Sequence, residues 1–209
     1  MVLGVDEAKR WLTRVNDEIH HNKGYLTNLD QAIGDGDHGI NMARGFNEVQ
    51  KKLTVSTYAD LGGLCKDIGM TLLSKVGGAS GPLYGTIFLK MSGVLKGCET
   101  ASIDELTAAL DAGLKGIEER GKAKPGDKTM IDVWQPFIQY LQKNGESIDW
   151  DKVIILVKEK TEFTKEMEAK KGRAAYLGKR SIGHIDPGAA SSNILLTELA
   201  YVFKGEVTS

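Results

Sequence analysis

The residues that show the folding pattern of this chain most clearly are Val5-Asp-Glu-Ala8-Lys-Arg-Trp11-Leu12-Thr-Arg-Val15-Asn-Asp-Glu-Ile19. Apolar residues recur in this stretch at intervals of three and four, and charged residues fill the positions between them. This spacing matches the turn of an α-helix that buries one face and exposes the other. The stretch therefore predicts an amphipathic helix.

The same period returns along the rest of the sequence and predicts seven more helices. We expect them over about residues 40–53, 57–75, from 82, from 102, 128–143, 149–171 and 187–204. Pro82 suits a first turn, and Ser102 with Glu105 forms a capping box. The β-branched run at residues 153–157 is also compatible with a strand, but no turn residue isolates it, which favours helix. The sequence thus predicts an all-α fold, an antiparallel barrel or bundle of eight helices without strands.

The composition limits the possible class of protein. A chain of 209 residues suits a single domain, which we expect to span residues 1–209. The net charge of −1 provides no overall field for nucleic acid or an anionic membrane. We find no signal peptide and no apolar run long enough to cross a bilayer. Cys65 and Cys98 lack metal-binding spacing, so we expect reduced thiols and a cytoplasmic protein.

Four connections between the predicted helices are rich in glycine and polar residues: residues 34–39, 77–81, 121–126 and 178–188. They are the first, third, fifth and seventh connections of the predicted bundle. Alternate connections of an up-and-down bundle lie at the same end. We therefore expect these four to meet at one end and to form one site.

A cluster of carboxylates lies at the first of these connections. Asp30 precedes the connection, Asp35 and Asp37 lie within it, and no Lys or Arg stands between them. Carboxylate oxygens suit Mg²⁺, which takes further ligands from phosphate and water. A bridging carboxylate would let three aspartates hold two ions. The alternative is a solvated acidic turn with Asp37 as a helix N-cap. The three glycines of the turn and the neighbouring His38 and Asn41 favour the metal site.

Residues 34–39 also match the pattern G-x-G-x-x-G. A dinucleotide site of that type needs a preceding strand and a βαβ unit, and its pyrophosphate would be repelled by the aspartates. No GxxxxGK[ST] motif occurs in the sequence, which excludes a P-loop protein. The helix expected to begin near Gly39 could instead offer its N-terminal amides to a phosphate.

The other three connections carry groups that suit a nucleotide. Ser80 could cap the helix that follows residues 77–81, where free amides could bind phosphate oxygens; close packing of two helix ends is the alternative. The basic residues 120–130 could enclose a nucleotide, or Lys122 and Lys124 could belong to a solvated turn. Met130 could face adenine or lie in the core.

The last connection, residues 171–188, is long and dense in hydrogen-bond donors. Long ordered connections in compact domains are usually functional. An arginine here would offset the charge on a transferring phosphoryl group. His184 could serve the site or be structural.

At these motifs the sequence resembles the L subunit of the bacterial dihydroxyacetone kinases over essentially its whole length. The resemblance rests on Gly34-Asp-Gly-Asp-His-Gly39, Gly77-Gly-Ala-Ser-Gly-Pro82, Gly126-Asp-Lys-Thr-Met130, Lys171-Gly-Arg173 and Gly183-His-Ile-Asp-Pro-Gly188. It implies an eight-helix barrel with ADP or ATP at one end. It also implies that Asp30, Asp35 and Asp37 bind two Mg²⁺. We further expect Arg173 to act in catalysis, by offsetting the charge on the transferred phosphoryl group. The nucleotide-binding positions that the resemblance implies are His38, Gly39, Asn41, Ala79, Ser80, Gly121, Met130, Arg173, Asp186, Pro187 and Gly188.

The resemblance further implies a phosphoryl relay that needs partner proteins. ADP would be a tightly held cofactor, recharged to ATP in place by a phosphohistidine protein, the M subunit. A separate K subunit would hold dihydroxyacetone and supply the acid–base groups. Two alternatives stay open: a standalone kinase subunit with exchangeable ATP, and a non-catalytic nucleotide-sensing adaptor for a transcriptional regulator.

Overall fold

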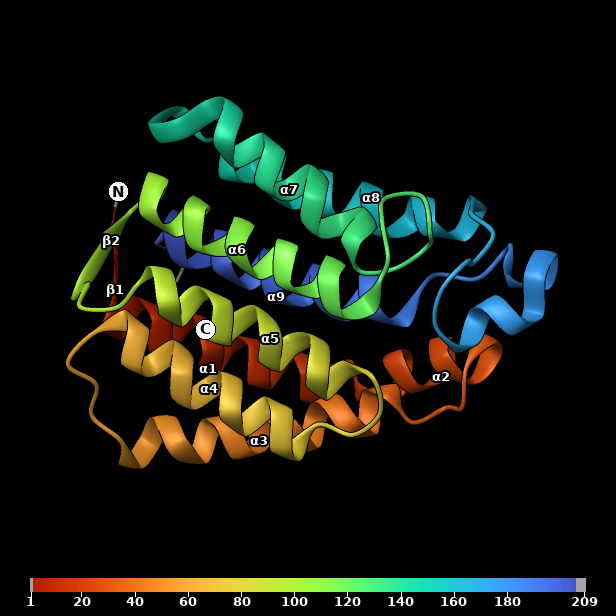
Figure 1. Cartoon of the computed structure of the whole chain (residues 1–209), viewed down its shortest axis with the longest axis horizontal. Helices are drawn as coiled ribbons and strands as arrows, with labels where there is room; N and C mark the ends of the chain where they lie inside the picture. The colour runs from red at the N-terminus through yellow and green to blue at the C-terminus, as the bar shows by residue number, and fades with distance from the viewer. Residues whose placement is uncertain (1, 206–209) are drawn as a thin grey trace.

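The computed structural model describes residues 2–205, and within them the chain forms nine α-helices, two short strands and three 3-10 helices (Figure 1). The α-helices are α1 (Val5–His21), α2 (Lys23–Ile33), α3 (His38–Val55), α4 (Leu61–Lys75), α5 (Ser80–Val94), α6 (Ile103–Gly121), α7 (Ile131–Asn144), α8 (Trp150–Phe163) and α9 (Pro187–Lys204). The strands are β1 (Val2–Gly4) and β2 (Thr100–Ser102), and the 3-10 helices are η1 (Gly145–Ser147), η2 (Thr164–Glu166) and η3 (Arg173–Ser181).

Eight of the α-helices form a closed antiparallel ring. From α3 to α9 each packs against the next, while α1 packs against both α3 and α9 and so closes the ring. Successive members run in opposite directions (Figure 1). The all-α, eight-helix barrel expected from the sequence is therefore confirmed.

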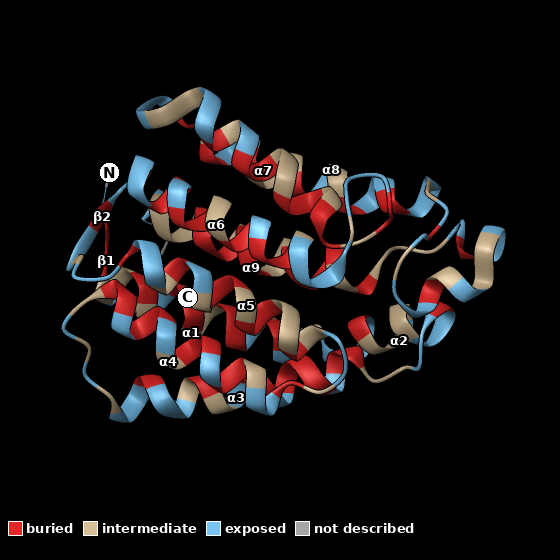
Figure 2. Cartoon of the chain, in the orientation of Figure 1, coloured by how far each residue is buried: buried red, intermediate tan, exposed pale blue. Residues whose placement is uncertain are grey.

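Side chains fill the interior of the ring. Trp11, Phe46, Tyr84, Phe88 and Trp134 are all almost completely buried and belong to one apolar cluster with residues of every ring helix. The buried faces turn inward in Figure 2. Each such side chain contributes about 1.5–3 kcal/mol of transfer free energy. Among the described residues, no helix combines the length and the apolar content needed to span a membrane.

Helix α2 lies outside the ring and was not predicted. It packs against α3 and α9 at the end where the ring helices α3, α5, α7 and α9 begin. Only Leu26 and Ile33 are buried on it, and so short an apolar pattern gives a weak helical period. Asp30 consequently lies in the last turn of a helix and not in a loop.

The expectation of no strands was wrong in one place. Strand β1 pairs antiparallel with β2, with Val2 opposite Ser102 and Gly4 opposite Thr100. Strands of three residues are too short to show a polar–apolar alternation. The capping box on α6 is confirmed, because Ser102 Oγ accepts the Glu105 N–H and Glu105 accepts the Ser102 N–H.

Two helix boundaries differ from the prediction. The helix expected from residue 128 begins at Ile131, since Gly126 and Lys128 have φ of 89° and 60°. The helix expected over 149–171 ends at Phe163, and the chain continues as the 3-10 helix η2 until Met167 takes up extended backbone. The run at residues 153–157 lies inside α8, so the helical interpretation is confirmed.

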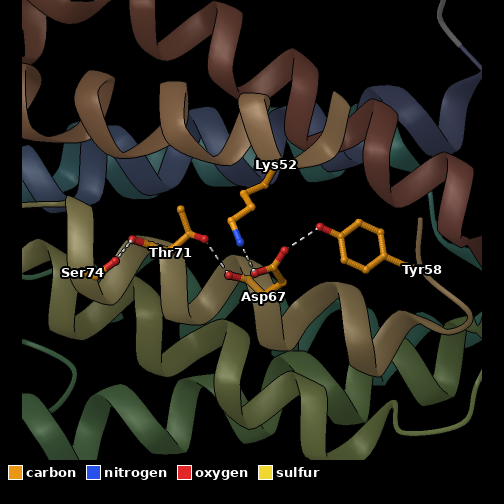
Figure 3. Close-up of polar contacts among 5 residues, drawn as sticks. All are labelled: Lys52, Tyr58, Asp67, Thr71 and Ser74. Atoms are coloured by element: carbon orange, nitrogen blue, oxygen red, sulfur yellow. Dashed lines mark hydrogen bonds and ion pairs between the residues drawn. The ribbon is translucent and has the colours of Figure 1, made fainter. Parts of the chain in front are cut away.

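A polar cluster fixes the connection between α3 and α4 (Figure 3). This connection lies at the end of the barrel away from α2 (Figure 1). Asp67 on α4 accepts hydrogen bonds from Lys52 Nζ on α3 (3.1 Å) and from Tyr58 Oη in the connection (2.9 Å). Burial and the bond to Asp67 raise the pKa of Tyr58 to about 12, so the phenol stays a donor. One carboxylate thus joins two helices and the segment between them.

Candidate functional site

A cavity of about 370 Å³ opens at the end of the barrel where α3, α5, α7 and α9 begin. Its volume falls in the range of small-molecule sites. Residues from all four glycine-rich connections contribute to its wall, as the alternation of connections predicted. The wall includes Asp30, Asp35, Asp37, His38, Gly77, Gly78, Ala79, Ser80, Arg120, Gly121, Lys128, Met130, Lys171, Arg173, Asp186, Pro187 and Gly188.

The three predicted metal ligands lie together at this cavity. One carboxylate oxygen from each of Asp30, Asp35 and Asp37 lies within 4.8 Å of the other two. Asp30 Oδ2 also accepts the backbone N–H groups of Asp37 (2.9 Å) and His38 (3.1 Å), which folds the turn back onto α2. Asp37 occupies the N-cap position of α3, but its side chain makes no capping bond. Its carboxylate is therefore available to a cation, and this all-oxygen donor set suits Mg²⁺.

Two glycines make this convergence possible. A Cβ at Gly34 would collide with Oδ1 of Asp30. Gly36 has a φ of 75°, which side chains rarely adopt. Gly39 has another role, because it lies in α3 against the carbonyl of Lys23 and does not line the cavity.

Arg173 brings positive charge to the carboxylates from far along the chain. Its Nη2 lies 2.9 Å from Asp35 Oδ2, although the side chain as a whole remains 68% exposed. The sequence around the aspartates contains no cation to offset them, and the fold supplies one through η3. The guanidinium thus stands beside the carboxylates at the cavity wall, where an anionic ligand could reach it.

His38 is the first member of a hydrogen-bonded chain that runs from the cavity into the core. Its Nδ1 lies 3.0 Å from Ser80 Oγ, and its Nε2 lies 2.9 Å from Ser191 Oγ. Burial lowers the pKa of His38, opposed by Asp30 and Asp37. Ser80 therefore binds His38 and does not cap α5, which corrects the expected cap.

The chain continues through Tyr84, whose hydroxyl lies 2.7 Å from Ser191 Oγ and 2.9 Å from Ser192 Oγ. Trp134 Nε1 donates to the same Ser192 Oγ at 2.9 Å. Burial raises the pKa of Tyr84 to about 12, so the phenol keeps its proton. These buried polar groups satisfy one another and hold the imidazole in one orientation.

Asp186 is the N-cap residue of α9 and lies in the cavity wall. Its Oδ2 accepts the Ala189 N–H at 2.7 Å and so caps the helix. Burial raises the pKa of Asp186 to about 7, and the nearby Asp132 and Asp30 act in the same direction. The carboxyl group is therefore partly protonated near neutral pH.

The apolar part of the wall surrounds Met130, which is 4% exposed. Leu83, Ile117, Ala123 and Ile131 line the cavity as well. These aliphatic side chains provide a surface of the kind that accommodates the flat face of a base. The sequence marked only Met130 in this group, because Leu83, Ile117 and Ile131 follow the helical period like ordinary core residues and Ala123 lies in the basic turn.

Asn41 is the second predicted nucleotide-binding residue, after Gly39, that lies off the wall. Its Oδ1 accepts a hydrogen bond from Arg44 Nη2 at 2.7 Å. A Cβ at Gly77 would come within 2.6 Å of this oxygen. Asn41 therefore lies under the Gly77 turn and supports it.

Some residues of the site were not identified from the sequence. Tyr84, Trp134 and Lys128 fit the helical period or a basic turn and gave no separate indication. Ser191 and Ser192 are two polar residues on the buried side of α9. That pair could have suggested a buried polar contact.

Known proteins resemble this chain in sequence and in fold. The family model described as DAK2 domain matches residues 32–201. The chain is 51% identical over 195 residues to the PEP-dependent dihydroxyacetone kinase 1, ADP-binding subunit DhaL, of Listeria innocua serovar 6a, covering 93% of this chain and 95% of that protein. It is 43% identical to the PEP-dependent dihydroxyacetone kinase, ADP-binding subunit DhaL, of Escherichia coli K12. This match covers 98% of this chain and 100% of that protein.

A solved structure has the same fold. The dihydroxyacetone kinase from C. freundii in complex with AMP-PNP and Mg²⁺ superposes with a TM-score of 0.76 at 25% identity, covering 95% of this chain. The chain corresponds to 33% of that longer protein. Given the extent of the sequence match and the shared fold, the chain belongs to the DAK2 domain family, and within it to the DhaL subunits of dihydroxyacetone kinases.

Proposed function

We propose that this chain is the nucleotide-binding subunit of a dihydroxyacetone kinase that relays phosphoryl groups in the cytoplasm. The observation that carries the proposal is the position of the Asp30, Asp35 and Asp37 carboxylates at the cavity, within 4.8 Å of one another. The full-length relatives named as ADP-binding subunits of PEP- or PTS-dependent dihydroxyacetone kinases support it, at 43–51% identity.

Asp30, Asp35 and Asp37 would hold two Mg²⁺ ions. Three carboxylates can ligate two ions when one of them bridges. Bound Mg²⁺ offsets the charge of the nucleotide phosphates. Arg173 then adds a further cation, since its guanidinium already lies 2.9 Å from Asp35.

The nucleotide would lie with its base on the apolar wall around Met130 and its phosphates toward the carboxylates. The helices α3, α5 and α9 begin at this cavity, and their N-terminal amides favour an anion. Amides of residues 77–80 would bind phosphate oxygens, with Ser80 held by His38. Arg173 would offset the charge that spreads over the transferred group, so this chain contributes mainly positioning and electrostatics.

The relay would run in two transfers that leave the nucleotide in place. In the first, the phosphorus–nitrogen bond of a phosphohistidine on the M subunit breaks, and a bond forms to a β-phosphate oxygen of ADP, giving ATP. In the second, a hydroxyl oxygen of dihydroxyacetone on the K subunit attacks the γ-phosphorus, which gives dihydroxyacetone phosphate and ADP. The hydroxyl proton would pass to a base of the K subunit.

Reconstitution tests this function. The purified chain is mixed with a K subunit and dihydroxyacetone, and with either free ATP or a phosphoenolpyruvate-driven phosphotransfer system that includes the M subunit. We expect many turnovers only with the second donor, and ADP that stays bound through dialysis.

Two other outcomes would overturn parts of the proposal. Sustained turnover with free ATP would indicate exchangeable nucleotide and reject the relay. Nucleotide binding without transfer from either donor would indicate a sensing adaptor, for example for a transcriptional regulator, and reject the enzymatic role.

A further inference from the structure

A buried lysine lies beside the cavity, where its charge interacts with that of Asp186 without forming an ion pair. Lys128 is 1% exposed and ranks among the largest fully buried side chains. Among residues 2–205, no carboxylate forms an ion pair with it. Lysines are almost never fully buried unless their charge is compensated. The groups that accept hydrogen bonds from Lys128 therefore indicate its role.

Those groups are two backbone carbonyls of a single segment. Lys128 Nζ donates to the carbonyl oxygen of Met167 (3.1 Å) and to that of Ser181. Both belong to the connection between α8 and α9, one on each side of Arg173. One ammonium group thus joins the two ends of the segment 167–181, which carries the arginine of the site.

Further hydrogen bonds fix the same segment, one of them to the turn that carries Lys128 and two within the segment itself. The Lys170 N–H donates to the carbonyl of Asp127 at 3.0 Å. Ser181 Oγ accepts the Ala169 N–H at 2.8 Å and donates to the Gly178 carbonyl at 2.6 Å. The hydrogen bonds of the segment therefore centre on Lys128 and Ser181, both of which are buried.

Apolar packing beneath this segment is slight. Of its residues, only Ala169, Ala174 and Leu177 join a small apolar cluster, with Ile33 of α2, and that cluster is separate from the barrel core. Segments with few buried apolar contacts open at low free-energy cost. Polar contacts must then determine where the segment lies.

The backbone of Lys128 supports a specific placement of its side chain. Its φ is 60°, in the left-handed region that residues with a Cβ rarely occupy. Such conformations persist where the surroundings fix them. Here the buried ammonium and its two carbonyl acceptors provide that constraint.

We propose that Lys128 is a positioning residue, whose buried ammonium holds the segment 167–181 against the turn 124–130 and thereby keeps Arg173 beside Asp35. The proposal deepens the proposed function, because its catalytic consequence rests on phosphoryl transfer at this site. Its structural consequence is independent of any activity.

Hydrogen–deuterium exchange on the full chain tests the structural part. Lys128→Met keeps an unbranched side chain that is one atom shorter and removes its charge and donors. We expect the amides of residues 169–181 to exchange about tenfold faster or more, as the loss of hydrogen bonds to a charged group predicts. Amides of α1 and α4 should exchange as before. Unchanged exchange in residues 169–181 would overturn the proposal.

Lys124→Met is the matched control, because Lys124 is an exposed lysine of the same turn. It should leave the exchange of the segment unchanged. Ser181→Ala is a second variant, needed because Lys128→Met can fail to fold. It removes the hydroxyl that joins Ala169 and Gly178 and should accelerate exchange in the same residues. Wild-type exchange in Ser181→Ala would also contradict the proposal.

Phosphoryl transfer in the reconstituted system tests the catalytic part. Lys128→Met should lower kcat by about the same factor as Arg173→Ala. The double variant should be no slower than Arg173→Ala alone, because both changes remove the same contribution, that of the Arg173 guanidinium. A loss of kcat in the double variant equal to the product of the two single losses would show that Lys128 acts independently of Arg173 and would overturn the proposal. Absence of transfer in the wild-type chain would reject the proposed function, while the exchange experiment would still decide the role of Lys128.

Discussion

The carboxylates of Asp30, Asp35 and Asp37 lie within 4.8 Å of one another, and the guanidinium of Arg173 pairs with one of them, Asp35. A divalent cation would offset the charge of these carboxylates, and the oxygen-only donor set favours Mg²⁺. Each carboxylate has a distinct environment. Asp30 also organises the turn through two backbone N–H groups, whereas Asp37 makes no capping bond.

Asp37→Asn therefore separates metal binding from folding. The amide has the size of the carboxylate but lacks its charge, so we expect the affinity for ADP in the presence of Mg²⁺ to fall about 100-fold, equivalent to about 2.7 kcal/mol. Titration calorimetry measures this change. The circular dichroism spectrum should be unaltered, because Asp37 does not cap α3.

Asp111→Asn is the control for this substitution. Asp111 lies on α6, away from the cavity wall, and pairs with Lys115. Its neutralisation should leave ADP affinity within error of the wild type. Undiminished ADP binding by Asp37→Asn would contradict the metal assignment.

Asp186 gives the chain a pH-dependent stability. The folded chain keeps a proton on Asp186 up to about pH 7, and the unfolded chain loses it near pH 3.8. Folding thus takes up a proton between these values, so this residue makes the free energy of unfolding fall as pH rises from about 4 to about 7. Asp186→Asn should remove this contribution while its amide oxygen still caps α9.

Urea unfolding in the presence of a chelator, at several pH values between about 4.5 and 7.5, measures this difference. The wild type should lose stability relative to Asp186→Asn as the pH rises. Parallel curves for the two proteins would show that Asp186 is ionised in the folded chain throughout this range.

Four helices meet at the hydrogen-bonded chain beneath the cavity. His38 comes from α3, Ser80 and Tyr84 from α5, Trp134 from α7, and the two serines from α9. The N-terminal halves of these helices are thereby joined by polar contacts in an otherwise apolar interior. Such satisfied networks specify one arrangement of the elements around them.

Tyr84→Phe removes the central hydroxyl of this chain. We expect the free energy of unfolding to fall by about 1–3 kcal/mol, because both serine hydroxyls lose a buried partner. ADP should also bind more weakly, since Ser191 then orients His38 less firmly. Urea unfolding and ADP titration measure the two effects.

Tyr140→Phe provides the comparison, because the Tyr140 hydroxyl makes only a long contact of 3.5 Å to the Asp149 carbonyl, near the other end of α7. It should change stability by less than about 0.5 kcal/mol and leave ADP affinity unaltered. Equal effects of the two substitutions would show that the hydrogen-bonded network around Tyr84 has no special role in the site.

Elements with a long apolar period were predictable, and short ones were not. The ring helices repeat their pattern over several turns, and the β-branched run of α8 could be assigned to a helix because no turn residue isolates it. Helix α2 buries only two residues, and strands β1 and β2 have three residues each. Their structure depends on the neighbours they pack against, which a local pattern does not contain.

The closed ring determines where the site lies in the whole molecule. Because neighbouring helices alternate in direction, the connections 34–37, 76–79, 122–130 and 164–186 all emerge at one end (Figure 1). The opposite end carries the polar cluster of Asp67 and the β1–β2 pair. The candidate site and these two local structures therefore lie at opposite ends of the barrel.

Binding of a nucleotide that joins four connections should stabilise the whole barrel. At ADP concentrations about 100 times the dissociation constant, with Mg²⁺ present, mass action adds about 2.7 kcal/mol. For a chain of this size that corresponds to a rise in Tm of about 5–10 °C. Differential scanning fluorimetry measures it, and a chelator should abolish most of the increase. An equal increase with and without chelator would argue against metal-mediated binding.

The sequence by itself determined the helical class, the order of the ring helices and the end at which four connections meet, because these follow from an apolar period and from the alternation of antiparallel helices. It also marked Asp30, Asp35 and Asp37, because three carboxylates without a nearby cation stand out locally. The tertiary structure alone decided that Arg173 reaches Asp35, that Lys128 holds its segment, and that Tyr84 joins His38 to the core. These contacts join residues far apart in the chain, and their energies depend on burial and orientation that no local pattern encodes.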